Sequence, residues 1–401
     1  MIPVDQQLEI VRRGVAEIVP DDELASKLEK SLKEGRPLRV KLGLDPTAPD
    51  IHLGWSVVLR KLRQFQDLGH EACLIIGDFT AQIGDPSGKS KTRKQLTSEE
   101  VRKNAKDYEE QLFKILDPEK TRFFFNSDWL GTMTFADVIK LGAKYTLARM
   151  LEREDFAKRF AGQQPISIHE LLYPLCQGYD SVAIEADIEM GGMDQKFNNL
   201  VGRDLQREYG QEPQVALMMP LLIGLDGVEK MSQSLGNYVG IMEPPNEIYG
   251  KLMSISDEMM EQYFELCTDI PMVEVQQVLS GHPKEAKQRL AREIVSLYHS
   301  VEDAAHAEAE FSRVFSQRDV PTEMDALRIT SEDLDGGKVS ILKLIRKAGF
   351  APSNNEARRL VEQGGVSIDG MTVSDPYAQL APPDGGVLKV GKRKFARVSL
   401  G

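Results

Sequence analysis

The sequence predicts an α/β fold: a parallel sheet with helices between its strands, then a helical region and a small α+β module. Up to about residue 245, short strand-like runs alternate with helix-like segments, as in a parallel sheet with crossover helices. The strand pattern then disappears, and residues 246–318 have helical patterns alone. After Lys338, short strands separated by Gly, Pro and Asp turns follow helices near 339–348 and 354–363.

Each element of the first region has its own local signal. Residues 5–19 and 21–34 have the apolar spacing of amphipathic helices. Residues 38–45 alternate as in a strand, and residues 72–76 are continuously apolar, like a buried parallel strand. The other expected helices cover residues 54–68, which Gly69 ends, 98–115 and 194–209. The other expected strands cover residues 122–125, 188–190 and 215–223.

These patterns divide the chain of 401 residues into several domains. We expect a sheet domain over 1–245, a helical domain over 246–320, a linker over 321–335 and a compact module over 336–401.

The charge is distributed unevenly along the chain. The net charge is -12, but residues 336–401 carry 11 Lys+Arg and 5 Asp+Glu, or +6, which leaves -18 for the remainder. A basic tail on an acidic body indicates contact with RNA or DNA.

Composition also excludes several classes of protein. Three cysteines are too few for a disulfide framework or a four-cysteine zinc site. No apolar run reaches the ~18 residues of a membrane span, and the first residues do not resemble a secretory signal. We therefore expect a cytoplasmic protein without membrane contact and without a metal site built from its own side chains.

Two short segments suit phosphate chemistry. His52-Leu53-Gly54 lies where the loop after the first sheet strand enters a helix, and a helix N-terminus favours anions. Lys230-Met231-Ser232-Gln233-Ser234 follows the last strand. Taken singly, the two segments are more often an ordinary loop histidine and a solvated lysine.

Together the two segments resemble the signature motifs of class I aminoacyl-tRNA synthetases. A longer ordered set resembles bacterial tyrosyl-tRNA synthetases; it consists of Asp45-Pro46-Thr47, Gly84-Asp85-Pro86-Ser87-Gly88-Lys89, Tyr173 with Gln177 and Asp180, and Gly191-Gly192-Met193-Asp194-Gln195. The segments 351–359 and 365–370 resemble the αL-type RNA-binding domain that ends these enzymes. The resemblance covers essentially the whole chain and implies a Rossmann-like catalytic domain.

The resemblance also implies a reaction and its partners. L-tyrosine is joined to tRNA(Tyr) through a tyrosyl-adenylate, with ATP and Mg²⁺ as substrates, without a permanently bound cofactor, in a homodimer. Because neither step needs an enzyme nucleophile, catalysis is expected to consist of positioning and stabilisation of phosphate charge.

The resemblance assigns roles to individual residues. Catalytic contacts to the ATP phosphates and pyrophosphate are implied for Thr47, His52, Lys89, Arg93 and Lys230. Contacts to the rest of ATP are implied for Gly54, Trp55, Gly192 and Asp194. Tyrosine binding is implied for Asp85, Tyr173, Gln177, Asp180 and Gln195.

The spacing of three of these residues supports a pocket independently. Tyr173, Gln177 and Asp180 fall at i, i+4 and i+7 on one helix face. A solvent-facing amphipathic helix is the alternative, and the surrounding apolar residues argue against it. A carboxylate at Asp180 in a closed pocket would favour tyrosine over phenylalanine, since phenylalanine leaves the acceptor unpaired. Tyrosyl-tRNA synthetase is itself the standard example of this discrimination.

Three positions depart from the family pattern. Trp55 stands where a second histidine is usual, so its indole either donates to the ribose, stacks near adenine or packs into the core. Gln233 replaces the second lysine of the other signature motif, and Lys41 occupies the position of a tyrosine that often contacts the substrate hydroxyl.

These departures leave alternatives open. The chain is interpreted as an active enzyme, with a tRNA-binding paralogue that has weak or lost adenylation as the alternative. A tryptophanyl-tRNA synthetase conflicts with Asp180 and with the basic C-terminal module. A small nucleotidyltransferase conflicts with the long C-terminal half.

Overall fold

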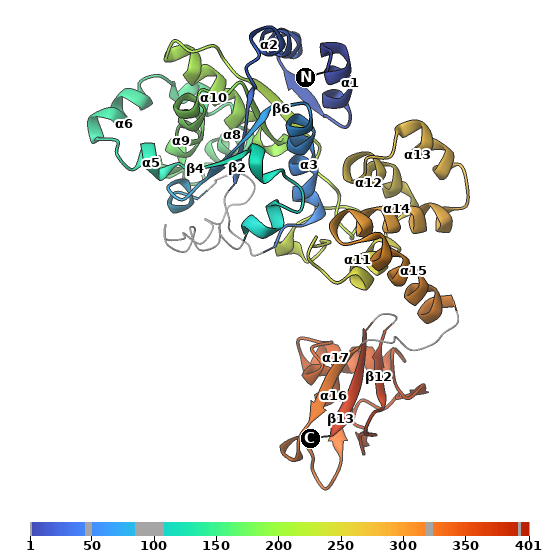
Figure 1. The fold of residues 1–401 in the computed structure, drawn as a ribbon. Helices are drawn as coiled ribbons and strands as arrows, with labels where there is room; N and C mark the ends of the chain where they lie inside the picture. Colours follow the sequence, from blue (N-terminus) through green and yellow to red (C-terminus); the bar gives the residue numbers. More distant parts are fainter. Residues whose placement is uncertain (1, 45–49, 85–107, 317–323, 392–393, 401) are drawn as a thin grey trace. The chain divides into compact units, whose positions relative to one another are not determined.

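The computed structural model describes residues 2–44, 50–84, 108–316, 324–391 and 394–400, drawn in colour in Figure 1. The chain forms two compact units, Met1–Ala305 and His306–Gly401. None of the helices among the described residues combines the length and apolar character needed to cross a membrane.

A six-stranded sheet forms the centre of the larger unit, in the order β1-β6-β5-β2-β3-β4 (Figure 1). Its strands are β1 (Glu17–Val19), β2 (Arg39–Leu44), β3 (Glu71–Ile76), β4 (Thr121–Phe125), β5 (Ile188–Gly192) and β6 (Val215–Met219). Strands β2 to β6 are parallel, and β1 joins β6 antiparallel at the edge. The parallel α/β sheet predicted from the sequence is confirmed.

The structure corrects two of the expected elements of this sheet. The helix expected over 5–19 ends at Arg12, and β-branched Ile18 and Val19 pair instead with β6. The strand expected over 215–223 ends at Met219, since the next residue, Pro220, has no N–H for the ladder.

Helices surround the sheet. They are α1 (Val4–Arg12), α2 (Asp21–Glu34), α3 (Leu53–Asp67), α5 (Ser127–Leu130), α6 (Phe135–Gly142), α7 (Leu147–Met150), α8 (Glu154–Ala161), α9 (Ile168–Ile184) and α10 (Lys196–Glu208). Of the helix expected over 98–115, only 108–112 is helical within the described residues. Leu175 and Val182 of α9 form a buried cluster with Val201 and Leu205 of α10, so α9 has a fixed position beside the sheet.

The strand order places a topological switch point between β2 and β5. From β2 the chain adds β3 and β4 on one side, and then β5 and β6 on the other. Loops leaving the carboxyl ends of β2 and β5 diverge there, which is where open α/β sheets bind ligands.

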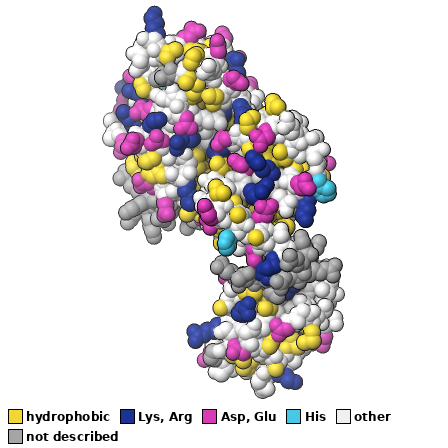
Figure 2. All heavy atoms as spheres, turned by 45° about the vertical axis from the view of Figure 1, so that its right-hand side comes forward, with side chains coloured by type: hydrophobic (Ala, Val, Ile, Leu, Met, Phe, Trp, Pro, Cys, Tyr) yellow, Lys and Arg dark blue, Asp and Glu magenta, His cyan; other side chains and the backbone are white. Residues whose placement is uncertain are grey.

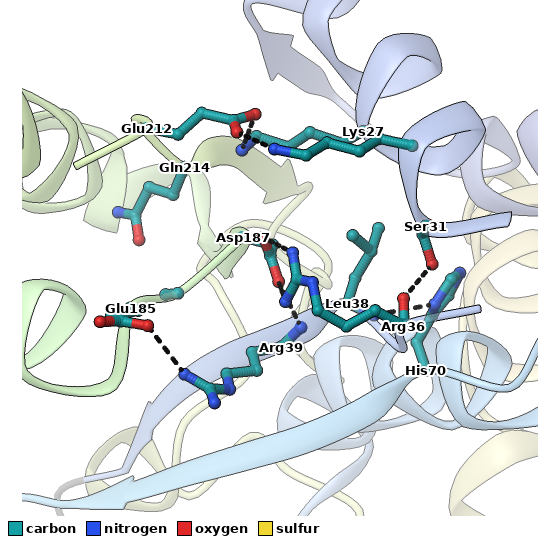
Figure 3. A network of polar contacts seen from close by, with 12 residues as sticks. Lys27, Ser31, Arg36, Leu38, Arg39, His70, Glu185, Asp187, Glu212 and Gln214 are labelled. Carbon is teal, nitrogen blue, oxygen red and sulfur yellow. Dashed lines mark hydrogen bonds and ion pairs between the residues drawn. The ribbon is translucent and has the colours of Figure 1, made fainter. Parts of the chain in front are cut away.

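A polar network fixes the opposite ends of the same two strands (Figure 3). Asp187, which precedes β5, accepts two hydrogen bonds from the Arg36 guanidinium, at 3.0 and 2.8 Å, and one from the backbone N–H of Arg39 at 2.8 Å. Lys27 of α2 pairs with Glu212 at 3.1 Å. The Asp187 contacts hold β2 and β5 in register at the end away from the switch point, and the Lys27 contact joins α2 to the segment before β6.

After a loop region that follows β6, the regular elements from Pro245 to Ser316 are helices. These helices are α11 (Pro245–Leu252), α12 (Met260–Cys267), α13 (Met272–Leu279), α14 (Pro283–Tyr298) and α15 (Val301–Ser316). Buried residues such as Ile248, Phe264 and Leu290 pack between α11, α12 and α14.

The smaller unit contains a five-stranded sheet in the order β10-β9-β12-β13-β7 and a two-stranded ladder of β11 with β8. Its elements are β7 (Asp325–Ile329), β8 (Val339–Ser340), α16 (Ile341–Lys347), α17 (Asn354–Glu362), β9 (Val366–Ile368), β10 (Met371–Thr372), β11 (Gln379–Leu380), β12 (Val387–Val390) and β13 (Lys394–Leu400). β7 lies within the segment expected to be a linker, and it pairs parallel with β13. Leu327 and Ile329 of β7 enter the core of this unit, so that part of the linker expectation is wrong.

Candidate functional site

The two signature segments meet at the carboxyl end of β2. His52 precedes α3 and forms an antiparallel bridge with Gly240, which follows the second segment. The Gly54 N–H lies 3.3 Å from the Met231 sulfur, and the Gln233 amide donates to the Asp50 carbonyl at 2.7 Å. The fold therefore brings together two motifs that lie about 180 residues apart in the sequence.

His52 has a buried and neutral imidazole at this junction. Burial lowers the pKa of His52 to about 4, so its imidazole is uncharged at neutral pH. Its Nδ1 atom is buried and has no hydrogen-bond partner among the described residues. An unpaired buried polar atom is costly, and here it points to a ligand that completes the site.

Glycine at position 54 suits the close packing of the two motifs. A Cβ there would lie 3.0 Å from the His52 ring and 3.3 Å from the Met231 Cβ. A side chain would therefore require His52 and Met231 to move by a few tenths of an ångström.

The carboxyl end of β5 contributes a carboxylate and a close backbone. Asp194 follows Gly192 and pairs with Lys230, with 2.7 Å between Oδ2 and Nζ. A Cβ at Gly192 would lie 2.8 Å from the Asp194 carboxylate and 3.0 Å from Leu221, so another residue here would displace the carboxylate from its present position. Gln195 is close by and accepts a hydrogen bond from Asn198 at 2.9 Å.

Trp55 is partly exposed, with 37% of its surface accessible. Its backbone N–H bonds to the His52 carbonyl at 2.9 Å. Of the three interpretations of Trp55, packing into the core is therefore wrong, and the two contacts with a nucleotide stay open.

Helix α9 places the three predicted pocket residues together. Tyr173 and Asp180 are buried and Gln177 is partly buried. Such a helix face does not behave as a solvated surface, so the alternative of a solvent-facing helix is wrong.

Asp180 has two donors that the sequence did not reveal. The Trp129 indole N–H donates to Asp180 at 2.8 Å, and the Asn126 amide donates at 3.4 Å. Burial raises the pKa of Asp180 to about 7, although Lys41 and these two donors oppose the rise. Asn126 and Trp129 directly follow β4, so the rule that sites gather at the carboxyl ends of parallel strands points to them.

Four predicted site residues lie outside the described residues. They are Thr47, Asp85, Lys89 and Arg93.

The basic residues of the smaller unit differ in their partners. Lys343 and Lys347 both pair with Asp333 and keep the pKa of that carboxyl below its usual range. Arg346 and Arg359 have no ion pair among the described residues. Figure 2 shows acidic and basic side chains interspersed on the visible face of the larger unit.

Comparisons with known proteins agree along the whole chain. The profile described as tRNA synthetases class I (W and Y) matches residues 33–316, and an S4 domain profile matches residues 340–384. A Tyrosine--tRNA ligase from Moorella thermoacetica is 60% identical over 98% of this chain and 96% of its own length. One from Carboxydothermus hydrogenoformans is 59% identical over 99% of both chains.

Solved structures share the fold. The tyrosyl-tRNA synthetase from Archaeoglobus fulgidus, complexed with L-tyrosine, has a TM-score of 0.61 at 23% identity, covering 76% of this chain and 100% of its own. A truncated mitochondrial enzyme from Aspergillus nidulans has a TM-score of 0.63 at 21% identity, covering 79% of this chain and 95% of its own. The sequence matches over nearly the full length show that the chain belongs to the class I aminoacyl-tRNA synthetases, in the tyrosine–tRNA ligase family.

Proposed function

We propose that this enzyme attaches L-tyrosine to tRNA(Tyr) in an ATP-dependent reaction. The tyrosine carboxylate attacks the α-phosphorus of ATP, and the bond to pyrophosphate breaks. A hydroxyl of the terminal tRNA ribose then attacks the adenylate carbonyl, loses its proton, and AMP leaves. Identity of 60% to a tyrosine–tRNA ligase along the whole chain supports this reaction over that of a paralogue without adenylation.

The buried carboxylate of Asp180 is the observation that supports tyrosine as the amino acid substrate. In the proposed pocket, Asp180 accepts the phenolic hydroxyl of tyrosine. Tyr173, Gln177 and Asp85 receive the ammonium group, and Gln195 faces the tyrosine carboxylate. Phenylalanine and tryptophan present no hydroxyl to this acceptor.

The ATP site is proposed at the junction of the two signature segments. His52, Thr47, Lys89, Arg93 and Lys230 act on the phosphates. The buried unpaired Nδ1 of His52 supports its role, because a phosphate-bound imidazole would no longer lack a partner.

The nucleoside is proposed to lie along the end of β5. Asp194 accepts a ribose hydroxyl, Gly192 and Gly54 allow close approach, and Trp55 donates to or stacks on the nucleoside. ATP is proposed to bind as its magnesium complex, with the metal belonging to the substrate.

The smaller unit is proposed to bind tRNA. Its match to the S4 domain profile and its local charge of +6 support this assignment. Phosphate contacts by Lys and Arg strengthen binding without reading sequence. We also propose that the enzyme works in the cytoplasm.

A homodimer is part of the proposal. Large apolar side chains of α6, α8 and α9 are exposed: Phe135 at 81%, Phe160 at 66% and Ile168 at 80%. Exposed apolar side chains gathered in one part of a chain are typical of an interface. Sedimentation of the enzyme with Phe135→Asp, expected to shift toward the monomer, tests this part.

The test of the function is tyrosine-dependent exchange between ATP and pyrophosphate, run beside phenylalanine and tryptophan. We expect exchange with tyrosine alone. In Asp180→Asn, loss of a charged hydrogen bond of about 1.5–3 kcal/mol lowers kcat/KM for tyrosine by about 10-fold to 150-fold. Asp128→Asn, at an exposed carboxylate of α5 next to Trp129, is the control. Unchanged selectivity against phenylalanine in Asp180→Asn would overturn the assignment.

A further inference from the structure

Lys41 is a fully buried lysine in the middle of β2. Its ammonium contacts the Gln177 carbonyl at 2.8 Å, the Ser181 hydroxyl at 2.8 Å and the Glu189 carboxylate at 2.9 Å. An ammonium group has three donors. All three are engaged, so Lys41 has no proton left to donate to the hydroxyl of a bound tyrosine.

The partner of Lys41 is set by strand register. Lys41 of β2 lies directly beside Glu189 of β5 in the parallel ladder. Glu189 is also buried, and it accepts from the Ser181 hydroxyl at 3.0 Å and from the Gln177 amide at 3.2 Å. The amide of Gln214 donates to the same carboxylate.

The pair therefore joins two central strands to one segment of α9. Gln177 and Ser181 are one helical turn apart, and each contacts both charges of the pair. Asp180 lies between them in sequence, on the same turn. Fixing Gln177 and Ser181 fixes the direction in which Asp180 leaves the helix.

We propose that the buried Lys41–Glu189 pair is a positioning device for tyrosine selection, which holds Gln177 and Asp180 in their binding geometry without touching the substrate. The inference rests on the proposed function, because it takes Gln177 and Asp180 as tyrosine-binding residues. Lys41, paired with Glu189 of β5, occupies the β2 position that would otherwise carry a direct partner for the substrate hydroxyl.

The pair also acts on the charge of Asp180. The groups that face this carboxylate are Lys41, Glu189, Asn126, Trp129 and, on its own helix, Cys176. Lys41 lowers the pKa of Asp180 and Glu189 raises it. Removing Lys41 alone leaves Glu189 as an unopposed neighbour, and Asp180 then binds a proton at higher pH.

The experiment compares Lys41→Met, Glu189→Gln and the double variant in the full-length enzyme. The readouts are kcat and KM for tyrosine in pyrophosphate exchange, selectivity against phenylalanine, the pH profile of kcat/KM and Tm. We expect Lys41→Met to raise KM for tyrosine by on the order of 10-fold to 100-fold through misplaced contacts. In this variant kcat is expected to change less than KM, and the acidic limb of the pH profile of kcat/KM is expected to move to higher pH.

The double variant separates positioning from the effect of an unpaired buried charge. With both charges removed, neither is left buried and unpaired, so we expect the double variant to recover most of the pH limb. Its KM for tyrosine is expected to stay raised, because the Lys41 contacts to Gln177 and Ser181 are still absent. Lys27→Met is the matched control, because Lys27 is a buried lysine paired with Glu212 away from the site. It is expected to lower Tm without changing KM or the pH limb.

Two outcomes would overturn the inference. In the first, Lys41→Met lowers Tm like Lys27→Met and leaves KM and the pH limb unchanged, which means a structural role only. In the second, the double variant regains the KM of the unmodified enzyme, which means that the unpaired charge of Glu189, and not a lost position of Gln177 and Asp180, raised the KM of Lys41→Met. If Lys41→Met does not fold, Glu189→Gln and the double variant decide between the same results. Absence of tyrosine-dependent exchange in the unmodified enzyme would contradict the proposed function itself and is measured first.

Discussion

At the residue scale, Gln233 changes the way the signature loop is held. A lysine at this position would bring a positive charge toward the phosphates. The glutamine instead donates to the Asp50 carbonyl at 2.7 Å, beside the contact between Gly54 and Met231. With Gln233, the positive charge of a lysine is replaced by a neutral hydrogen bond that ties the two motifs together.

This tie leads to a first prediction. Gln233→Ala removes one hydrogen bond with a net value of about 0.5–1.5 kcal/mol, so we expect kcat of pyrophosphate exchange to fall by about 2-fold to 10-fold. KM for tyrosine is expected to stay the same. Gln276→Ala, at an exposed glutamine that bonds to Glu261, serves as the control. An unchanged kcat in Gln233→Ala would mean that the tie does not contribute to catalysis.

Individual residues also show what the sequence can and cannot reveal. The shared helix face of Tyr173, Gln177 and Asp180 follows from spacing alone, and the structure agrees with it. The pairing of Lys41 with Glu189 depends on the register of two strands almost 150 residues apart, which no local pattern encodes. Roles that come from the family resemblance stay predictions until they are measured.

At the scale of elements, strands β2 and β5 are held at both ends. Asp187 ties their amino ends to Arg36 and Arg39, and the Lys41–Glu189 pair ties their centres. The loops that carry the site therefore leave from two strands with a fixed register.

The amino-end tie gives a prediction about stability. Asp187→Ala leaves a backbone N–H and a guanidinium without their acceptor, so we expect the free energy of unfolding to fall by about 1–3 kcal/mol. Differential scanning calorimetry measures this change from the unfolding transition of the larger, catalytic unit. Lys158→Ala, at an exposed i,i+4 pair with Glu154, is expected to change it by no more than about 0.5 kcal/mol. Equal effects of the two variants would contradict the role of Asp187.

Long, strongly patterned elements were the most predictable. α2, α3, β3 and β5 are found where periodicity or a buried apolar run placed them. β1 and β7 were missed because each is a short edge strand whose partner, β6 or β13, is far away in sequence. Their stability comes from the ladder they complete, so their own sequence carries little of the signal.

At the scale of the whole molecule, the chain combines an acidic catalytic unit with a basic module. β7 belongs to the sheet of the smaller unit, so removal of residues 336–401 alone would leave this strand without β13. A truncation after Ser316, the last residue of α15, avoids that problem.

For the enzyme truncated after Ser316, we expect tyrosine-dependent exchange to stay within about 2-fold. KM for tRNA is expected to rise at least about 10-fold at physiological salt, since each lost phosphate contact weakens binding. Within the full chain, Arg346→Gln with Arg359→Gln should weaken tRNA binding more than Lys343→Gln with Lys347→Gln. The two lysines already pair with Asp333. Unchanged charging by the truncated enzyme would refute RNA binding by the module.

The ion pair between Lys230 and Asp194 has a consequence for the timing of the proposed cycle. Both side chains are partly solvated, at 48% and 34% exposure, and pairs of this kind are worth about 0–1 kcal/mol. Lys230 pairs with the same carboxylate that is proposed to accept the ribose hydroxyl. In the proposed cycle, nucleotide binding replaces this weak ion pair by the ribose contact at low cost, and the ion pair forms again when AMP leaves.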